Sequence, residues 1–269
     1  MNNQNHETKR ILLTLRFDGS GFYGWQAQSG GNTIQQILQD AVQSVFNERL
    51  GISGCGRTDA GVHAYGYCCH IDIKKDFPIE RLANAINTYF ISRNIKISVI
   101  DVKEVDSEFH SRYYIKSKEY IYKIQNNKYR DPFYINKAFY YFKPLDLIKM
   151  REAAKYLTGE HNFASFMADK SDIPIDEAVR TVYKIDIKSE TLENETNITN
   201  IIDIYIAASG FLYKMARIIA GTLVEVSEGK INPCDLPDII NAKNRGKSGR
   251  TLPPHGLYLN KIEYYDKIE

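Results

Sequence analysis

The chain has 269 residues, of which 43% are hydrophobic and 25% charged, and its formal net charge is +2. These values are typical of a folded protein and exclude an intrinsically disordered one. No window approaches the roughly 18 apolar residues of a membrane span, and the opening segment MNNQNHETKR lacks the apolar core of a signal peptide. We therefore expect a cytoplasmic protein with either one large domain or, more in keeping with its length, two.

Hydrophobic periodicity predicts alternating strands and helices in the first half of the chain. Thr33 and Gln36 have the spacing of a helix capping box, and in the second predicted helix Leu82, Ile86 and Tyr89 are expected to point inward. The predicted elements are a strand over Ile11–Phe17, a helix over Ile34–Phe46, a strand over Tyr65–Lys74, a helix that starts near Pro78, and a strand over Ile95–Val105.

The second half repeats this alternation. Its expected elements are a strand over Tyr113–Gln125, a helix over Leu147–Leu157, strands over Val179–Ser189 and Ile201–Ala208, a helix over Phe211–Val226, a short helix after Pro233, and a strand over Gly256–Tyr265. The polar stretch between Ser189 and Asn200 is expected to be an exposed hairpin connection. Together the two halves indicate layered α/β or α+β structure, with helices covering a sheet face.

The run Gly54-Cys55-Gly56-Arg57-Thr58-Asp59-Ala60-Gly61-Val62-His63-Ala64 lies just before a predicted strand. Its three glycines allow positive φ or a close approach to a ligand, and Arg57 can pair with an anionic oxygen near Asp59. One interpretation is a loop that presents a reactive carboxylate. The other is a tight surface turn with a solvated ion pair worth less than ~1 kcal/mol.

This run closely resembles the signature of the tRNA pseudouridine synthase A family, with Asp59 at the family's catalytic position. Six further blocks follow the family's order: FDGSGFYGWQ at 17–26, FHSR at 109–112, KEYIY at 118–122, GEHNFASF at 159–166, GFLYKMARIIAG at 210–221 and PPHGLYL at 253–259. The resemblance implies a pseudouridine synthase fold of class α+β, in which two ferredoxin-like halves, 1–107 and 108–269, share a mixed, mainly antiparallel central sheet flanked by helices, with an active-site cleft between the halves.

The implied activity is the isomerisation of uridine to pseudouridine at positions 38, 39 and 40 in the anticodon stem-loop of tRNA. All atoms are conserved in this reaction, so no cofactor or metal is expected. Asp59 would act as nucleophile at ribose C1′ or as a base that forms a glycal, and the sequence does not separate these routes. The resemblance also implies a homodimer that binds tRNA.

Three further residues are expected at the catalytic site. Arg57 is the candidate charge partner of Asp59. Arg217 matches the Arg-bearing family motif, although a surface arginine with a buried stem is the alternative. Tyr120 is expected to lie over the target base and to take the C5 proton, whereas Tyr122 is expected to be a core residue.

The remaining expected contacts concern substrate binding. Leu257, together with Tyr258, is expected to pack under the site and exclude water. His63 has two possible roles, a phosphate contact or a structural one. The densest basic stretch, NAKNRGKSGRT, places Arg245 and Lys247 where they can contact RNA phosphates, although such loops are often merely solvated.

The chain departs from the common family pattern at five positions. Cys55 replaces a common serine, Tyr67 and Cys68 replace Gln-Val, Asn162 replaces an aspartate, and Arg250 replaces a proline. These departures leave open a paralogue that modifies another RNA uridine. Two other classes remain possible, a non-catalytic RNA-binding module and a zinc-dependent RNA-modifying enzyme. The zinc ligands would come from Cys55, His63, Cys68 and His70, but their spacing fits no usual zinc site. The four cysteines form no C-x-x-C pair, which argues against a disulfide framework.

Overall fold

The computed structural model describes residues 8–74, 77–169, 171–194 and 197–265. The chain divides into two compact units, of which unit 1 comprises Met1–Lys116 and Leu259–Glu269 and unit 2 comprises Ser117–Tyr258. This division differs from the predicted boundary between residues 107 and 108. The segment after residue 107 groups with unit 1 because the Phe109 ring packs 4.9 Å from the Tyr264 ring, and the Tyr264 hydroxyl donates to the Ser111 carbonyl at 2.9 Å.

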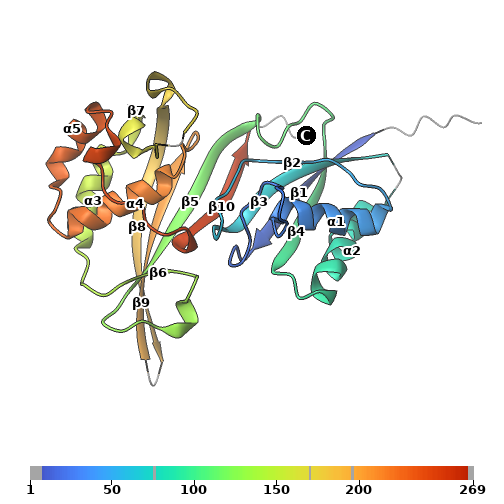
Figure 1. Cartoon of the computed structure of the whole chain (residues 1–269), viewed down its shortest axis with the longest axis horizontal. Coiled ribbons are helices and arrows are strands. Elements are labelled where there is room, and N and C mark those ends of the chain that lie inside the picture. Colours follow the sequence, from blue (N-terminus) through green and yellow to red (C-terminus); the bar gives the residue numbers. More distant parts are fainter. Residues whose placement is uncertain (1–7, 75–76, 170, 195–196, 266–269) are drawn as a thin grey trace, which may run out of the picture. The chain divides into compact units, whose positions relative to one another are not determined.

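Unit 1 contains an antiparallel sheet in which β1 (Lys9–Phe17) lies between two other strands (Figure 1). Its strands run in the order β4-β1-β3, and the short β2 pairs with β3. The other elements are α1 (Ile34–Phe46), β2 (Ile52–Gly54), β3 (His63–Ile73), α2 (Ile79–Ser92) and β4 (Ile97–Val105). The resulting β-α-β-β-α-β sequence and strand order are ferredoxin-like. Residues of β10 (Leu257–Tyr264) extend this sheet beside β3.

The helices of unit 1 form as amphipathic segments that bury one face. In α1, Ile34, Leu38 and Val42 are completely buried. Thr33 is the N-cap, but the predicted capping box is wrong, because no side chain makes a capping hydrogen bond there. In α2 the third inward residue is Phe90 rather than the predicted Tyr89, since Phe90 continues the stripe of Leu82 and Ile86 at a spacing of four.

Unit 2 repeats the same kind of layering. Its main strands are β5 (Ile115–Asn126), β9 (Asn197–Ala208), β8 (Val179–Asn194) and β7 (Gly159–Asn162), in this order in the sheet, and β6 (Phe139–Tyr141) pairs with β5. Helices α3 (Leu147–Tyr156), α4 (Met215–Ser227) and α5 (Leu236–Asn241) pack together on one side of the unit 2 strands (Figure 1). All strand pairs described here are antiparallel except β5 with β6.

Two boundaries in unit 2 differ from expectation. The polar stretch after Ser189 belongs to a hairpin, as predicted, but it is mostly strand, since Thr191 pairs with Asn200 and Leu192 with Thr199. Helix α4 begins at Met215 rather than near Phe211, because Lys214 has a left-handed φ of 60° that is incompatible with a helix.

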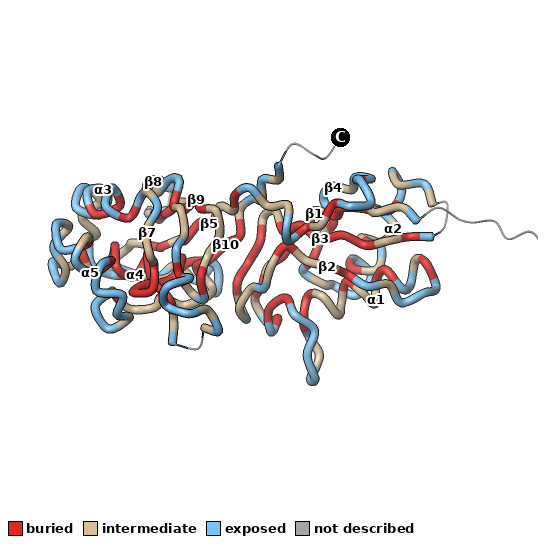
Figure 2. Tube along the Cα trace, turned by 90° about the horizontal axis from the view of Figure 1, so that it is seen from above, coloured by how far each residue is buried: buried red, intermediate tan, exposed pale blue. Residues whose placement is uncertain are grey.

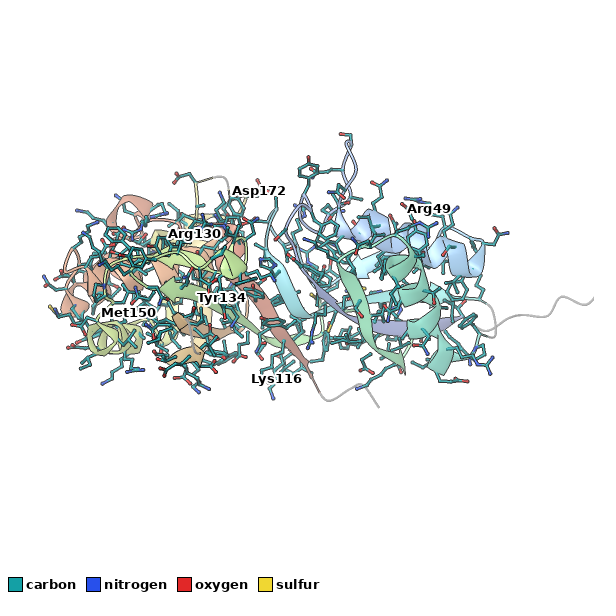
Figure 3. The ribbon with its side chains drawn as sticks, turned by 90° about the horizontal axis from the view of Figure 1, so that it is seen from below. Arg49, Lys116, Arg130, Tyr134, Met150 and Asp172 are labelled. Atoms are coloured by element: carbon teal, nitrogen blue, oxygen red, sulfur yellow. The ribbon has the colours of Figure 1, made fainter. Side chains whose placement is uncertain are left out.

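Burial follows the elements closely (Figure 2). In unit 1 the interior strands are buried, including Ile11, Leu13 and Leu15 of β1 at 0% exposure. Charged residues remain outside, such as Arg49 after α1 (Figure 3), which pairs with Asp40 at 3.3 Å. No helix among the described residues is long and apolar enough to cross a membrane.

Candidate active site

The loop between β2 and β3 carries the predicted catalytic carboxylate. Asp59 is half-buried, and its carbonyl accepts a hydrogen bond from the Val62 N–H at 3.2 Å. This bond closes a four-residue turn in which Gly61 has a φ of 79°. Gly at this position therefore meets the need for a positive φ in the turn that presents Asp59.

The FDGSGFYGWQ block lies against this turn. The Trp25 N–H donates to the Thr58 carbonyl at 3.3 Å. A Cβ at Gly24 would lie 2.3 Å from the Thr58 oxygen, and one at Gly19 would lie 2.0 Å from the Val62 oxygen. Two separate sequence blocks are thus needed to hold the Asp59 backbone in place.

An aromatic pair supports the start of the loop. Tyr67 on β3 stacks on Trp25, with ring centroids 4.1 Å apart, and the Tyr67 hydroxyl donates to the Gly56 carbonyl at 2.7 Å. A Cβ at Gly54 would lie only 2.1 Å from that hydroxyl oxygen. Tyr67, one of the departures from the family pattern, therefore has a structural role beneath the loop.

Arg57 and His63 flank Asp59 in the sequence but differ in environment. Arg57 is exposed. The His63 ring is 2% exposed, and its Nδ1 accepts a hydrogen bond from the Gly19 N–H at 3.0 Å and lies 3.2 Å from the Asp18 carboxylate. These contacts favour the structural role for His63.

Arg217 occupies the first turn of α4 and is 9% exposed. Its Nε donates to the Leu252 carbonyl at 2.7 Å, and the Leu252 N–H donates to the Arg217 carbonyl at 3.3 Å. The alternative of a surface arginine is therefore wrong, because this side chain is fixed between α4 and the segment that precedes β10.

The two tyrosines of the KEYIY block have different surroundings on β5. Tyr120 is half-buried, and its ring meets Phe211 edge-on at 4.8 Å. Tyr122 is completely buried, and its hydroxyl donates to the Pro253 carbonyl at 2.8 Å. The prediction that Tyr122 is a core residue is confirmed.

Leu257, Tyr258 and the basic stretch also belong to unit 2. Leu257 is 6% and Tyr258 7% exposed, and the Tyr258 hydroxyl donates to the Lys137 carbonyl at 2.7 Å. Arg245 is half-buried, whereas Lys247 is exposed. The predicted site residues therefore come from both units, with Arg57, Asp59 and His63 in unit 1 and Tyr120, Arg217, Arg245, Lys247 and Leu257 in unit 2.

The other departures from the family pattern have local explanations. The Asn162 amide donates to the Ile175 carbonyl at 2.7 Å, a bond that an ionised aspartate cannot make. Arg250 pairs with Glu228 at 2.6 Å. Cys55 and Cys68 are both buried, and the Cys55 N–H donates to the Cys68 carbonyl at 2.9 Å.

The zinc alternative receives no support from these contacts. The His70 Nδ1 lies 2.9 Å from the Ser111 hydroxyl, and Cys68 Sγ lies 4.0 Å from the Thr14 hydroxyl. Burial raises the pKa of the Cys68 thiol to about 12, which disfavours the thiolate that binds zinc. Within the described ranges, no three His, Cys, Asp or Glu side chains are grouped so as to hold a metal ion.

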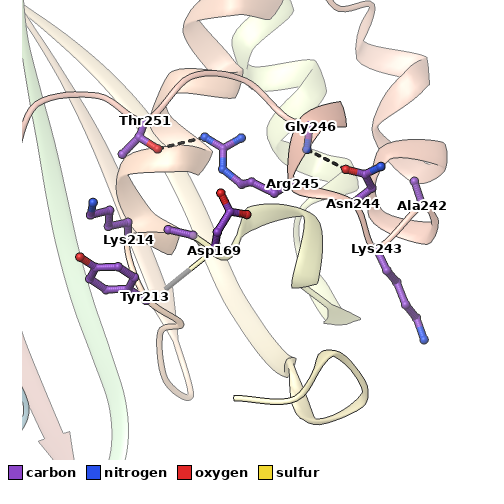
Figure 4. A pocket seen from close by; sticks show the side chains of 10 residues that line it. Asp169, Tyr213, Lys214, Ala242, Lys243, Asn244, Arg245, Gly246 and Thr251 are labelled. Carbon is purple, nitrogen blue, oxygen red and sulfur yellow. Dashed lines mark hydrogen bonds between the residues drawn. The ribbon is translucent and has the colours of Figure 1, made fainter. Parts of the chain in front are cut away.

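Unit 2 also contains a pocket of about 850 Å³ that the sequence did not predict (Figure 4). It is lined by Tyr213 and Lys214 before α4, by residues of the basic stretch that include Arg245, and by Asp169. Arg245 thus lies in a pocket, whereas Lys247 is not part of its lining. Tyr213 and Lys214 lie within the GFLYKMARIIAG block, but the sequence predicts no separate role for them because both fall in a stretch expected to be helix.

Comparisons with known proteins agree with this arrangement. The family model described as tRNA pseudouridine synthase matches residues 14–114 and 153–265. A protein named tRNA pseudouridine synthase A from Caldicellulosiruptor saccharolyticus is 39% identical over 256 residues, which cover 95% of this chain and 100% of the relative. One of the same name from Bacillus licheniformis is 40% identical over 257 residues, which cover 95% of this chain and 99% of the relative. The chain therefore belongs to the tRNA pseudouridine synthase family.

Proposed function

We propose that this protein converts uridine to pseudouridine in the anticodon stem-loop of cytoplasmic tRNA, at positions 38, 39 and 40. The proposal rests on the loop around Asp59. Gly19 and Gly24 pack directly against its backbone, and a Cβ at either position would clash with it. A solvated surface turn does not require such support. Family membership supplies the reaction class.

Asp59 is the catalytic carboxylate in this proposal. The bond between ribose C1′ and N1 of uracil breaks, the base rotates, and C1′ joins C5, while C5 loses a proton and N1 gains one. Asp59 either attacks C1′ or removes a ribose proton to form a glycal, and both routes need its ionised form. The reaction changes no oxidation state and consumes no co-substrate, so the proposal includes no cofactor.

The other residues bind and position the nucleotide. Arg217, held at Nε by the Leu252 carbonyl, supplies fixed positive charge for the carboxylate and the substrate. Tyr120 stacks on the target base, and its hydroxyl accepts the C5 proton once a basic neighbour has taken its own. Leu257 excludes water from the reacting sugar. Arg57 serves as the charge partner that orients Asp59 in the bound complex, and Arg245 and Lys247 contact the RNA phosphates.

The target uridine must leave its stack before it can reach Asp59, because a paired nucleotide hides C1′ and C5 from a protein side chain. We propose that a homodimer binds the tRNA during this step. Sedimentation of the protein with and without tRNA tests the oligomeric state independently of the chemistry.

The central experiment compares wild type with Asp59→Asn on unmodified tRNA transcripts. Pseudouridine is mapped at single-nucleotide resolution along the anticodon arm. We expect product at positions 38–40 with wild type only, and a loss of at least about 1,000-fold in rate with Asp59→Asn. Binding of tRNA by the variant should persist, because the substitution removes a negative charge.

Three outcomes would change the proposal. Product at other uridines would replace the anticodon assignment with another RNA site. Binding without product from wild type would favour a non-catalytic RNA-binding module. Full activity of Asp59→Asn would overturn the role of this carboxylate.

A further inference from the structure

The pocket of unit 2 has an excess of positive charge. Its lining contains three cationic side chains, Lys214, Lys243 and Arg245, and one carboxylate, Asp169. Lys243 pairs with Asp176 at 3.3 Å, so the excess charge rests on Lys214 and Arg245. Asp169 is exposed, so water screens its charge. Figure 4 shows the Arg245 guanidinium beside Thr251, and Lys243 extending away from them.

Two neutral hydroxyl groups hold the Arg245 guanidinium in position. Its Nη1 donates to the Ser248 hydroxyl and its Nη2 to the Thr251 hydroxyl, both at 2.9 Å. By contrast, Arg10 pairs with Asp72 at 2.7 Å and Arg250 with Glu228 at 2.6 Å. No carboxylate in the described ranges forms an ion pair with Arg245. The two hydroxyls therefore fix the guanidinium without neutralising it, as a site for an anion requires.

The backbone around the pocket is unusual. Six non-glycine residues of the described chain have positive φ, and four of them are asparagines, which tolerate this region well. The other two are Lys214 with φ 60° and Lys243 with φ 46°, and both line this pocket. Lys243 directly follows Ala242, the C-cap of α5, where a left-handed residue is common. Lys214 precedes α4 and has no such explanation, and strained conformations of its kind are concentrated at functional sites.

The rim of the pocket is also anchored to the core. The Asn244 N–H donates to the hydroxyl of fully buried Ser165 at 2.9 Å, and the Asn244 side chain accepts from the Gly246 N–H at 2.8 Å. The stretch that carries Arg245 is therefore preorganised. A preorganised cation loses less conformational entropy when it binds than a flexible one does.

We propose that this pocket binds one backbone phosphodiester of the tRNA, with Arg245 and Lys214 contacting the phosphate oxygens. Tyr213, which is 38% exposed and whose ring centroid lies 4.8 Å from the Lys214 ammonium, stacks on the base next to that phosphate. Lys247 lies outside the lining and makes no contact with this phosphate. The identity of the RNA rests on the function proposed above, whereas the phosphate chemistry does not.

The first test is the salt dependence of tRNA binding by wild type, Arg245→Gln and Lys214→Gln. Each phosphate contact contributes roughly 0.7 to 0.9 to the slope of log K against log salt concentration. We expect each variant to lower the slope by about that amount. Lys155→Gln, which removes an exposed lysine from the last turn of α3, is the matched control and should keep the wild-type slope.

The second test identifies the phosphate itself. Randomly ethylated tRNA is bound to each protein, and the bound and free fractions are sequenced. Wild type and Lys155→Gln should show interference at one phosphate that disappears with Arg245→Gln and with Lys214→Gln. Arg245 also bonds to Ser248 and Thr251, and its loss can unfold the loop. Lys214→Gln keeps the test valid in that case, because the Lys214 ammonium contacts the Tyr213 ring and does not hold the loop by a hydrogen bond in the described part of the chain.

Wild-type slopes and an unchanged interference pattern in both variants would overturn the pocket assignment. The pseudouridine assay reports separately on the function. Altered slopes in a protein that forms no pseudouridine would support the phosphate site and reject the reaction. Unaltered slopes in an active enzyme would reject the site and leave the reaction in place.

Discussion

Two tyrosines separated by one residue on β5 show how environment divides roles at the scale of single residues. The Tyr122 hydroxyl is committed to the Pro253 carbonyl, and burial raises the pKa of this phenol above its ordinary value. This buried hydroxyl therefore serves as a structural donor and does not face the substrate. Tyr120 is half-buried beside Phe211, where its ring remains partly accessible.

Tyr120→Phe should therefore affect catalysis, whereas Tyr122→Phe should affect stability. Loss of the Tyr120 hydroxyl should lower kcat about 100-fold or more with a smaller change in KM, because it removes the proton acceptor and keeps the ring. Tyr122→Phe should leave kcat near wild type and cost about 1 kcal/mol of unfolding free energy, since the Pro253 carbonyl loses its donor. Single-turnover kinetics and urea unfolding measure the two effects, and equal kinetic losses would contradict this division.

At the scale of elements, Gly54 at the end of β2 is required because neighbouring side chains pack closely against it, and not because of its backbone flexibility. Gly54 lies under the stacked rings of Trp25 and Tyr67, where a Cβ would come within 2.7 Å of Trp25 as well as 2.1 Å of the Tyr67 oxygen. Gly51, just before β2, has no neighbouring atom within 4 Å of a Cβ. Two glycines of the same short segment thus face different constraints.

Gly54→Ala should destabilise unit 1 by about 1–3 kcal/mol, since the aromatic pair must shift to admit the methyl group. Gly51→Ala is the matched control and should be neutral or slightly stabilising. Trp25 is the single tryptophan of the chain, so its fluorescence reports unfolding of this unit in urea. Equal stability of the two variants would contradict the packing argument.

At the scale of the whole molecule, we expect one cluster in unit 2 to contribute to stability at acid pH. The hydrogen bond from Arg250 lowers the pKa of Glu228 to about 2, with Lys230 and Tyr141 adding to the effect. The Arg250 N–H also donates to Glu225 at 3.0 Å, so the cluster joins the end of α4 to the segment before β10. The same segment supplies the carbonyls that accept from Arg217 and Tyr122.

Because the pKa of Glu228 is lowered on folding, its contribution to stability is present above the unfolded pKa of about 4.5 and is lost as the pH falls toward 2. Arg250→Met should cost about 2–3 kcal/mol at pH 7 and less than half of that at pH 3. Urea unfolding followed by circular dichroism at both pH values measures the difference. Glu228→Gln removes the titrating group and should flatten the same pH dependence; a cost independent of pH would contradict the linkage.

The sequence predicted the features that have a local pattern. Periodicity located the long strands and helices, and the glycines around Asp59 pointed to a constrained loop, which the contacts of Gly19 and Gly24 explain. Arg217 was identified by its resemblance to a motif and not by physics, since an arginine within an apolar run suits a surface position equally well.

What the sequence did not predict depends on tertiary contacts. Phe90 and Tyr89 both fit a helical stripe, and only packing selects Phe90. The left-handed Lys214, which delays the start of α4, has no sequence signal because lysine rarely adopts that conformation. The pocket around Arg245 was not predicted either, because it brings together stretches that are far apart in the chain.

The composition of unit 1 has a consequence for the order of events during synthesis. This unit combines the first 116 residues with the segment that starts at Leu259, and the ring of Tyr264 packs against Phe109. A ribosome has therefore already translated all of unit 2 when the last strand of unit 1 emerges. The Asp59 loop and its β2–β3 framework can form early, but the unit that contains them remains unfinished until the segment from Leu259 onward has been translated, so unit 2 can be the first of the two to complete its fold.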